Sequence, residues 1–427
     1  MTVPVVLEPV PRPLPGRRLP KELAPNAAYR LAEALPAGIH DPGFPGLLER
    51  IDEGTFHPGN RVEVFFDGGA AFAAMLAAVA GARFEVLLES YIFKNDATGQ
   101  WFAEALTKAA DRGVAVRVLA DGFGSWATRR SFWAGLRAHG VEVRLFHPLW
   151  SPIRHLPFRD HRKILVVDRR IAFTGGMNIG EEYGSSAPTP KQATTTSPGS
   201  PAWRDSHARV EGTAAWEMAV VFEEGWHHAG GERLGLEPLA LEPRPGARVL
   251  VLDSRAGRGA GEFASVVSAI AGAARKTLWI TTAYFAPRRR AIPILGGTAR
   301  RGVDVRLLVP GRSDVPLVRH AGHGFFDALL ARGVRVFEYQ AAILHAKTVV
   351  ADGLLSLVGS SNLDMRSFEA NAECNYAILD AETASRLEAR FREDLTQSVE
   401  IERRAWRRRG ALHRLLDAGA RRLSPLL

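Results

Sequence analysis

The chain has 427 residues, of which 46% are hydrophobic, so it can bury a large core and is neither disordered nor fibrous. Its net charge of +9 favours anionic partners, namely nucleic acid, an anionic bilayer surface or a phosphate-bearing substrate, although a basic soluble surface explains the charge equally well. The single cysteine, Cys374, excludes an internal disulfide and a cysteine-rich metal site, and it suits a reducing compartment.

Residues 1–45 form a proline-rich segment, which we expect to be an arm that wraps around the rest of the chain or is partly disordered. This segment has neither the apolar core of a signal peptide nor a stretch that could span a bilayer. The longest apolar run, residues 68–82, is short and rich in alanine and glycine, so we expect a helix packed on a sheet. If a membrane is involved, we therefore expect the protein to bind at the membrane surface.

The residues that follow alternate between strand-like and helix-like patterns, and the strand-like runs are as apolar as those of a buried parallel sheet. We expect, in chain order, a strand at 85–93, a helix at 99–112, a strand at 114–120, a second helix, a strand at 141–146, and paired strands at 163–168 and 171–176. Such alternation predicts an α/β sandwich.

The second half of the chain repeats the first. The stretch RGVAVRVLADG recurs as RGVDVRLLVPG, ESYIF as TAYFA, HGVEVRLF as RGVRVFEY, and HRKILVVD as HAKTVVAD. The four matches keep their order and lie 184 to 193 residues apart, with Tyr91 opposite Tyr284. The chain is therefore expected to consist of two copies of one unit, each of roughly 180 residues, a usual domain size. Residues 185–202, rich in Ser, Thr and Pro, interrupt the repeat as a loop that either overhangs the site or is an idle insertion.

The most informative repeated motif is H-x-K-x4-D. In a strand, His161 and Lys163 share one face, as do His345 and Lys347. An ammonium group neutralises phosphoryl oxygens while an imidazole attacks phosphorus or transfers a proton, so these four are candidate catalytic residues. Asp168 and Asp352 complete the catalytic motif and are counted among its candidate residues. By parity they point to the opposite face, and we expect them to be structural anchors.

Each motif is followed by a tight turn, GGMN in the first copy and GSSN in the second. Glycine lets backbone N–H groups approach an anion, and an asparagine amide adds a donor. We therefore expect Gly176, Asn178, Ser360 and Asn362 to bind the substrate phosphate.

A nucleophilic histidine needs an acceptor on its other ring nitrogen to fix the tautomer. Glu373, shortly after the second motif, is the expected partner of His345. The corresponding residue of the first copy is Asp205, and the smaller offset between these two residues is what the inserted loop would produce.

Three further groups have suggestive compositions, but each has a simpler interpretation. His227 and His228 with Glu223 and Glu224 are of metal-ligand types, yet a solvated helix end is the better interpretation. His320 and His323 are one helical turn apart and fit a surface helix. The basic clusters at 288–290 and 403–409 fit solvated faces, although Trp406 favours an interface for the second. No metal and no cofactor are expected.

With the doubled motif in place, the chain resembles the phospholipase D superfamily and, more specifically, the bacterial cardiolipin synthases of the phospholipase D type. The resemblance covers most of the chain from about residue 60 and is carried by HRKILVVDRRIAFTGGMNIG, RDSHARVEG and LHAKTVVADGLLSLVGSSNLDMRSFEANAE. The absence of an N-terminal transmembrane pair matches the short, membrane-peripheral branch. The low-complexity loop and the Gly176/Ser360 difference depart from the pattern.

The resemblance implies two tandem α/β/α sandwich units related by a pseudo-twofold, with the active site at their interface. We expect an arm at 1–45, a first unit at 46–240 and a second at 241–427, which includes a C-terminal helix.

The implied reaction is transfer of a phosphatidyl group between two phosphatidylglycerol molecules without a metal, through a covalent phosphatidyl-histidine. By analogy His161 is the expected nucleophile and His345 the acid/base. The expected location is peripheral, on the cytoplasmic side of the inner membrane, with no nucleic acid as partner. Two alternatives remain open: a phosphodiesterase that hydrolyses phospholipid or nucleic acid, and a non-catalytic binding scaffold. The sequence does not give the oligomeric state.

Overall fold

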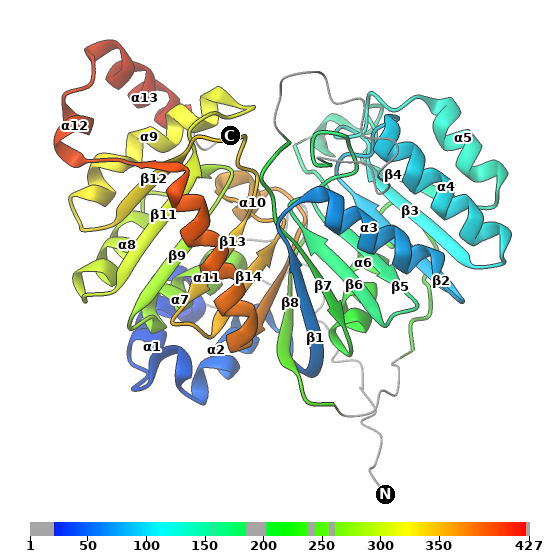
Figure 1. Ribbon diagram of the computed structural model, residues 1–427, viewed down its shortest axis with the longest axis horizontal. Helices are drawn as coiled ribbons and strands as arrows, with labels where there is room; N and C mark the ends of the chain where they lie inside the picture. Colours follow the sequence, from blue (N-terminus) through cyan, green and yellow to red (C-terminus); the bar gives the residue numbers. More distant parts are fainter. Residues whose placement is uncertain (1–20, 156, 185–201, 238–243, 256–260, 424–427) are drawn as a thin grey trace, which may run out of the picture.

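The structure, a computed structural model, describes residues 21–155, 157–184, 202–237, 244–255 and 261–423 (Figure 1). The described residues do not include residues 1–20, which are the proline-rich start of the expected arm, or residues 185–201 of the expected loop. The first copy of the repeat consists of β1 (His57–Phe65), α3 (Gly68–Ala80), β2 (Glu85–Ser90), α4 (Ala97–Asp111), β3 (Ala115–Asp121), α5 (Arg130–Ala138), β4 (Glu142–Phe146), η3 (Ile153–His155), β5 (Lys163–Val167), β6 (Ile171–Gly175), β7 (His207–Glu211) and α6 (Ala214–His228). The strands and helices expected from the sequence are all present, each within a few residues of its expected bounds.

The second copy repeats this order with β10, β15 and α10 added inside it and β17, α12 and α13 added at its C-terminal end. It consists of β8 (Ala247–Ser254), α7 (Glu262–Ala273), β9 (Thr277–Thr281), β10 (Phe285–Ala286), α8 (Ala291–Arg300), β11 (Asp304–Pro310), α9 (Pro316–Leu330), β12 (Arg335–Tyr339), β13 (Thr348–Ala351), β14 (Leu355–Gly359), β15 (Leu363–Asp364), α10 (Met365–Glu369), β16 (Glu373–Leu379), α11 (Ala381–Thr396), β17 (Ser398–Glu400), α12 (Arg403–Arg407) and α13 (Ala411–Leu423).

The strands of both copies join in one sheet of 15 strands. From β1 outward the order is β7, β6, β5, β2, β3, β4, and from β8 outward it is β16, β14, β13, β9, β11, β12, with β17 added at that edge. The two central strands, β1 and β8, pair antiparallel. A mirrored strand order about an antiparallel pair is what a twofold rotation produces, so the predicted pseudo-twofold is confirmed. The two sandwiches nevertheless share a continuous sheet.

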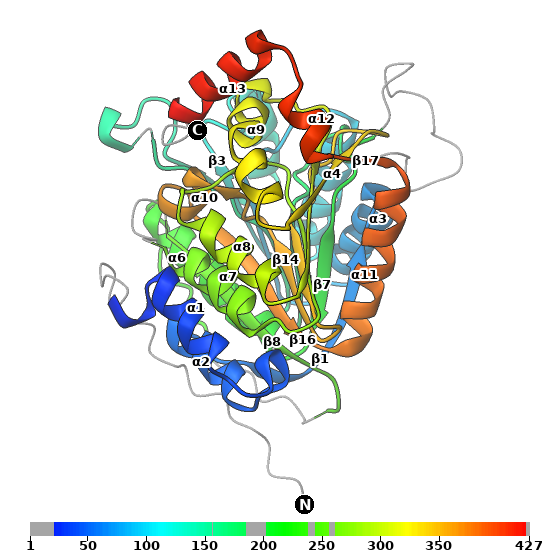
Figure 2. The ribbon, with the colours of Figure 1, turned by 90° about the vertical axis from the view of Figure 1, so that its left-hand side faces the viewer.

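Helices cover both faces of this sheet (Figure 2). Helices α3 and α11 lie on one face, and α6, α7 and α8 lie on the other. One apolar cluster joins Met218 and Phe222 of α6 to Val249 of β8 and Tyr376 of β16, so a helix of the first copy completes the core of the second. The two copies are therefore held together by buried apolar surface as well as by strand pairing.

The described part of the expected arm is helical. It contains η1 (Lys21–Leu23), α1 (Pro25–Glu33), η2 (Gly38–His40) and the start of α2 (Gly43–Asp52), and α1 and α2 pack on α7. The expected division into residues 1–45, 46–240 and 241–427 stays a prediction, and its first boundary falls inside α2. Within the described ranges, every helix is too short or too polar to cross a bilayer.

Candidate active site

The two H-x-K motifs lie at the same edge of the sheet. Lys163 opens β5 and pairs with Ser90, the last residue of β2. In the second copy, Thr348 opens β13 and pairs with Thr281, the last residue of β9. Because β5 and β13 run antiparallel to these neighbours, both motifs reach the edge where the parallel strands end. His161, Lys163, His345 and Lys347 are all buried there.

At each histidine, a backbone hydrogen bond connects the two copies. His161 N donates to Ala372 O over 2.9 Å, and His345 N donates to Arg204 O over 2.8 Å. Each acceptor belongs to the other copy and directly precedes that copy's carboxylate residue. The chain therefore brings each histidine beside the carboxylate of the other copy.

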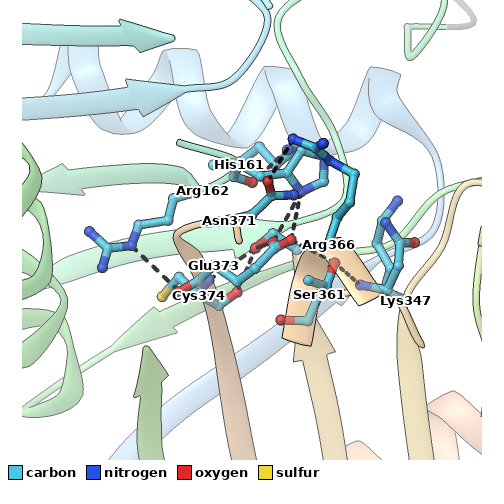
Figure 3. Close-up of polar contacts among 12 residues, drawn as sticks. His161, Arg162, Lys347, Ser361, Arg366, Asn371, Glu373 and Cys374 are labelled. Carbon is cyan, nitrogen blue, oxygen red and sulfur yellow. Dashed lines mark hydrogen bonds and ion pairs between the residues drawn. The ribbon is translucent and has the colours of Figure 1, made fainter. Parts of the chain in front are cut away.

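The side chains follow this crossing. His161 Nδ1 lies 3.0 and 3.1 Å from the two carboxylate oxygens of Glu373, as Figure 3 shows. His345 Nδ1 lies 2.7 Å from Asp205 Oδ2. The expected pairing of Glu373 with His345 is therefore wrong. Sequence proximity suggested pairs within one copy, whereas the twofold arrangement exchanges them. In both pairs the carboxylate contacts Nδ1, so Nε2 is the ring nitrogen that faces away from the carboxylate. Nε2 of His345 also lies 3.1 Å from Lys347 Nζ.

Glu373 is held by two serine hydroxyls. Ser360 Oγ donates to Oε2 over 2.5 Å, and Ser367 Oγ donates to Oε1 over 2.7 Å. Burial raises the pKa of Glu373 to about 7, although Lys163 and the two hydroxyls favour its ionised form. Ser367 was not identified from the sequence, although it lies in the quoted motif and follows Ser360 by seven residues.

Asp205 has a different setting. Its Oδ1 accepts from Ser206 N over 2.7 Å. Burial would raise the pKa of Asp205, but the charges of His345 and Lys347 outweigh burial and hold that pKa below its usual value. A Cβ at Gly176 would overlap Asp205 Oδ1, so any side chain there would displace the shorter carboxylate. This explains why the first copy has Gly176 where the second has Ser360.

The expectation that the turn residues bind phosphate needs correction at two positions. Gly176 N donates to Ser206 O, and Ser360 N donates to Cys374 O, so these backbone groups close the turns onto the neighbouring strands. Together with the Ser360 hydroxyl, they support the carboxylates. Asn178 donates to Tyr183 Oη over 2.7 Å, and Asn362 keeps a buried side-chain oxygen without a hydrogen bond. For the two asparagines, phosphate binding stays a prediction.

The cations of the site depress one another's pKa. Burial, together with the charges of Lys163 and Lys347, holds the pKa of His161 well below its usual range. Burial and Lys347 also lower the pKa of His345, against the opposing effect of Asp205. Burial lowers the pKa of Lys163 to about 7 and that of Lys347 to about 8. An anion that entered the site would relieve this repulsion, so the site favours a phosphoryl group.

Aromatic rings line both histidines and were not assigned to the site from the sequence. The Tyr91 ring centroid lies 4.9 Å from that of His161, and the Tyr284 centroid lies 6.2 Å from that of His345. Trp203 adds a second ring, 5.2 Å from His345. Burial raises the pKa of Tyr91 to about 12, so it stays a neutral donor. The signal was available, because the two tyrosines already stood opposite each other in the repeat.

Asp168 and Asp352 lie at the far ends of β5 and β13. The Asp168 carboxylate accepts from three successive backbone N–H groups at residues 83–85, over 2.9 to 3.0 Å. The Asp352 carboxylate accepts in the same way from residues 275–277, over 2.7 to 2.8 Å. Both residues have positive φ, 52° and 50°. These contacts are those of structural anchors, and they place both aspartates at the edge opposite the histidines.

The other candidate residues from the sequence have hydrogen-bond partners away from the catalytic histidines. His228 Nε2 lies 2.9 Å from His147 Nε2, and His227 Nδ1 lies 3.0 Å from Gly231 O, so the two point to separate partners.

His323 is buried rather than on a surface helix. It lies 2.9 Å from Glu338, and its neighbour His320 lies 2.8 Å from Asp417 of α13. Trp406 packs on His323 and Phe326, which is an interface inside the molecule.

Comparison with known proteins identifies the family. The family model described as "Cardiolipin synthase, PLD-like domain" matches residues 75–185 and 267–395. The chain is 31% identical to cardiolipin synthase 1 of Bacillus anthracis over 96% of its own length and 81% of that protein. It is 34% identical to the cardiolipin synthase of Halalkalibacterium halodurans over 89% of its own length and 75% of that protein.

Among solved structures, the phosphatidylserine synthase of Haemophilus influenzae superposes with a TM-score of 0.67. It has 12% sequence identity and covers 94% of this chain and 97% of that one, a likeness of fold. The family model and the relatives agree: the chain belongs to the cardiolipin synthase family of phospholipase D-like proteins.

Proposed function

We propose that this protein synthesises cardiolipin, by transferring a phosphatidyl group from one phosphatidylglycerol to a second and releasing glycerol. The observation that carries the proposal is the pair of crossed contacts, His161–Glu373 and His345–Asp205, which engage Nδ1 of both rings in one buried cationic site. Nε2 of His345 faces the Lys347 ammonium at 3.1 Å, and a substrate phosphate would take over that ammonium. Family membership supports a phospholipid as the substrate.

In the first step, Nε2 of His161 attacks the phosphorus of phosphatidylglycerol. The bond from phosphorus to the glycerol headgroup oxygen breaks, and protonated His345 gives its proton to that oxygen. Lys163 and Lys347 neutralise the non-bridging oxygens as charge develops on them. Glycerol leaves, and the phosphatidyl group stays on His161.

In the second step, a hydroxyl of another phosphatidylglycerol takes the place of glycerol. Neutral His345 removes the hydroxyl proton, the oxygen attacks phosphorus, and the bond from phosphorus to Nε2 breaks. Cardiolipin is formed and both histidines return to their starting states. If water took the place of the acceptor lipid, the same steps would give phosphatidic acid.

The electrostatics support His161 as the nucleophile. A nucleophile must be neutral, and the pKa of His161 is held well below its usual range. A general acid must carry a proton. Burial and Lys347 lower the pKa of His345 as well, but Asp205, whose own pKa is below its usual value, opposes that shift. Asp205 therefore keeps its negative charge and stabilises the imidazolium, whereas Glu373, with a pKa near 7, does so less.

The proposed reaction takes place at a membrane, because both substrates are bilayer lipids. We place the protein at the cytoplasmic surface of the inner membrane, which the single cysteine and the excess of positive charge support.

Incubation with phosphatidylglycerol vesicles, followed by thin-layer chromatography, tests the function. Cardiolipin with an equimolar amount of glycerol is the expected result. Phosphatidic acid alone would assign a hydrolase, and vesicle binding without turnover would assign a scaffold. His161→Ala and His345→Ala should each lose at least about a thousandfold in rate, whereas His139→Ala, an exposed histidine remote from the motifs, should match the wild type.

A labelled phosphatidyl donor and a rapid quench would trap the intermediate. Mass spectrometry should find the adduct on His161, and an adduct on His345 would reverse the two roles.

A further inference from the structure

Two loops of the first copy expose large apolar side chains. One connects β3 to α5, and the other, which contains η3, connects β4 to β5 and projects from the body of the molecule (Figure 2). We call their exposed apolar residues the apolar rim: Phe123, Trp126, Leu149, Trp150 and Ile153. Trp126, Trp150 and Ile153 are 69%, 70% and 84% exposed. Among the described residues, five of the twelve large hydrophobic side chains that are exposed belong to this rim, so exposed apolar side chains are concentrated on these two loops.

The apolar rim lies beside the catalytic edge. Both loops begin where β3 and β4 end, which is the edge at which β5 begins. Asp121, the last residue of β3, joins the two: its Oδ1 accepts from Phe123 N over 2.8 Å, and its Oδ2 accepts from Asp160 N over 2.9 Å. Asp160 directly precedes His161, so the rim and the nucleophile are connected by two hydrogen bonds to one carboxylate.

Arg159 holds the second loop together and contacts the first. Its guanidinium donates to His147 O over 3.0 Å and to His155 O over 3.2 Å, and it lies 5.8 Å from the ring centroid of Phe123. Arg159 is itself buried. The first loop is therefore held by Asp121 and the second by a buried arginine.

The charge around the apolar rim has one sign. Residues 122–130 and 147–158 contain three arginines and neither aspartate nor glutamate. The guanidinium of Arg130, which is exposed, lies 5.8 Å from the ring centroid of Trp150. Tryptophan prefers the interfacial region of a bilayer, and arginine is attracted to anionic headgroups. A surface that binds a protein partner would not require both exposed tryptophan and positive charge next to a site that processes lipids.

We propose that the apolar rim inserts into the interface of an anionic phospholipid bilayer and holds the catalytic edge over the headgroups. This inference rests on the proposed function, since it assumes that the substrate is a bilayer lipid. The bilayer would then deliver the scissile phosphodiester to His161 without a lipid having to leave the membrane completely. The exposed Val315 and Leu317, at the start of α9 in the second copy, lie at the equivalent edge.

The test compares the full-length wild type with a triple variant, Trp126→Ser, Trp150→Ser and Ile153→Ser. The matched control is Phe84→Ser, since Phe84 is also exposed but stands before β2, at the opposite edge of the sheet. Sedimentation with phosphatidylglycerol vesicles measures binding. Turnover is measured with the same vesicles and with dihexanoyl-phosphatidylglycerol below its critical micelle concentration.

The triple variant should lose at least tenfold in vesicle binding and vesicle turnover, and keep its rate on the short-chain lipid within twofold. The Phe84→Ser control should match the wild type in all three measurements. Full vesicle binding by the triple variant would overturn the proposal, as would equal wild-type binding to phosphatidylcholine and phosphatidylglycerol vesicles. If the wild type makes no cardiolipin from either lipid form, the proposed function fails, and the binding comparison still decides whether the rim docks.

Discussion

Replacing Glu373 by glutamine probes the crossed site at its most informative position. The substitution keeps the shape of the side chain but removes the charge that His161 Nδ1 contacts at 3.0 Å. A hydrogen bond to a charged group contributes about 1.5–3 kcal/mol. If this stabilisation is expressed when His161 gains positive charge on attack, formation of the phosphatidyl-histidine should slow roughly 10- to 150-fold.

The pH dependence makes this prediction specific. Burial raises the pKa of Glu373 to about 7, so wild-type activity should rise as the pH increases through that value and the carboxylate ionises. At higher pH it should fall as Lys347, with a pKa of about 8, loses its proton, whereas Lys163, with a pKa of about 7, titrates together with Glu373. In Glu373→Gln the acid limb should flatten while the alkaline limb remains.

The assay is cardiolipin formation from labelled phosphatidylglycerol between pH 5.5 and 8.5, with single-turnover measurement of the adduct. Ser367→Ala is the matched variant, because it removes a hydroxyl that stabilises the ionised carboxylate, and it should move the acid limb to higher pH. An acid limb unchanged in Glu373→Gln would refute the reasoning.

Three further predictions concern the surroundings of the site. Gly176→Ser should displace the Asp205 carboxylate and lower the rate at least about tenfold, measured in the vesicle assay, because the added Cβ overlaps it. Asp168→Ala should leave the chemistry nearly unchanged but lower the free energy of unfolding by about 2–4 kcal/mol in urea titration, since three backbone N–H groups lose their acceptor. Asp417 and Glu338 hold the pKa of His323 above its usual value in spite of burial. The stabilisation of α13 by His323 is therefore complete below about pH 6.5 and is lost as the pH rises through the folded-state pKa. Hydrogen exchange of residues 411–423 should show this loss, and Asp417→Asn should remove the pH dependence.

Each of these three has an outcome that would contradict it. A fully active Gly176→Ser variant would show that the turn has room beside the carboxylate. An Asp168→Ala variant with normal stability but no activity would make that aspartate part of the chemistry. Exchange of the last helix that is independent of pH would show that the histidine does not hold it.

Repetition made the fold readable from the sequence. A single copy of HRKILVVD is a strand with suggestive side chains, whereas two copies at one offset, each within an α/β unit, predict a twofold assembly with both histidines in one site. The anchoring role of Asp168 also followed from strand parity alone, and its three backbone contacts confirm that expectation.

The exchange of carboxylates could not be predicted, because it depends on how the copies are joined. Glu373 follows His345 by 28 residues, and within one unit that proximity favours their pairing. The antiparallel pairing of β1 with β8 instead orients the two copies so that His161 N donates to Ala372 O. Glu373, the next residue, is therefore placed beside the histidine of the other copy. Pairing across a twofold is a property of three-dimensional arrangement that spacing along one chain does not encode.

The sequence showed that the two turns differ, but it did not show why. Gly176 and Ser360 looked like unequal phosphate contacts, but the difference lies in the length of the carboxylate behind each turn. Aspartate reaches less far than glutamate, so the first turn must approach closely and has no space for a side chain. The second turn leaves a gap, which the Ser360 hydroxyl fills with a hydrogen bond to Glu373.

The most direct test of the crossed site is nuclear magnetic resonance of the histidine rings in protein labelled with ¹⁵N-histidine. Ring signals are assigned by comparison with His161→Ala and His345→Ala. In Asp205→Asn the Nδ1 signal of His345 should shift and that of His161 should stay, and Glu373→Gln should do the reverse. If Asp205→Asn moved the His161 signal and left that of His345 unchanged, each histidine would be paired within its own copy and the crossed site would be contradicted.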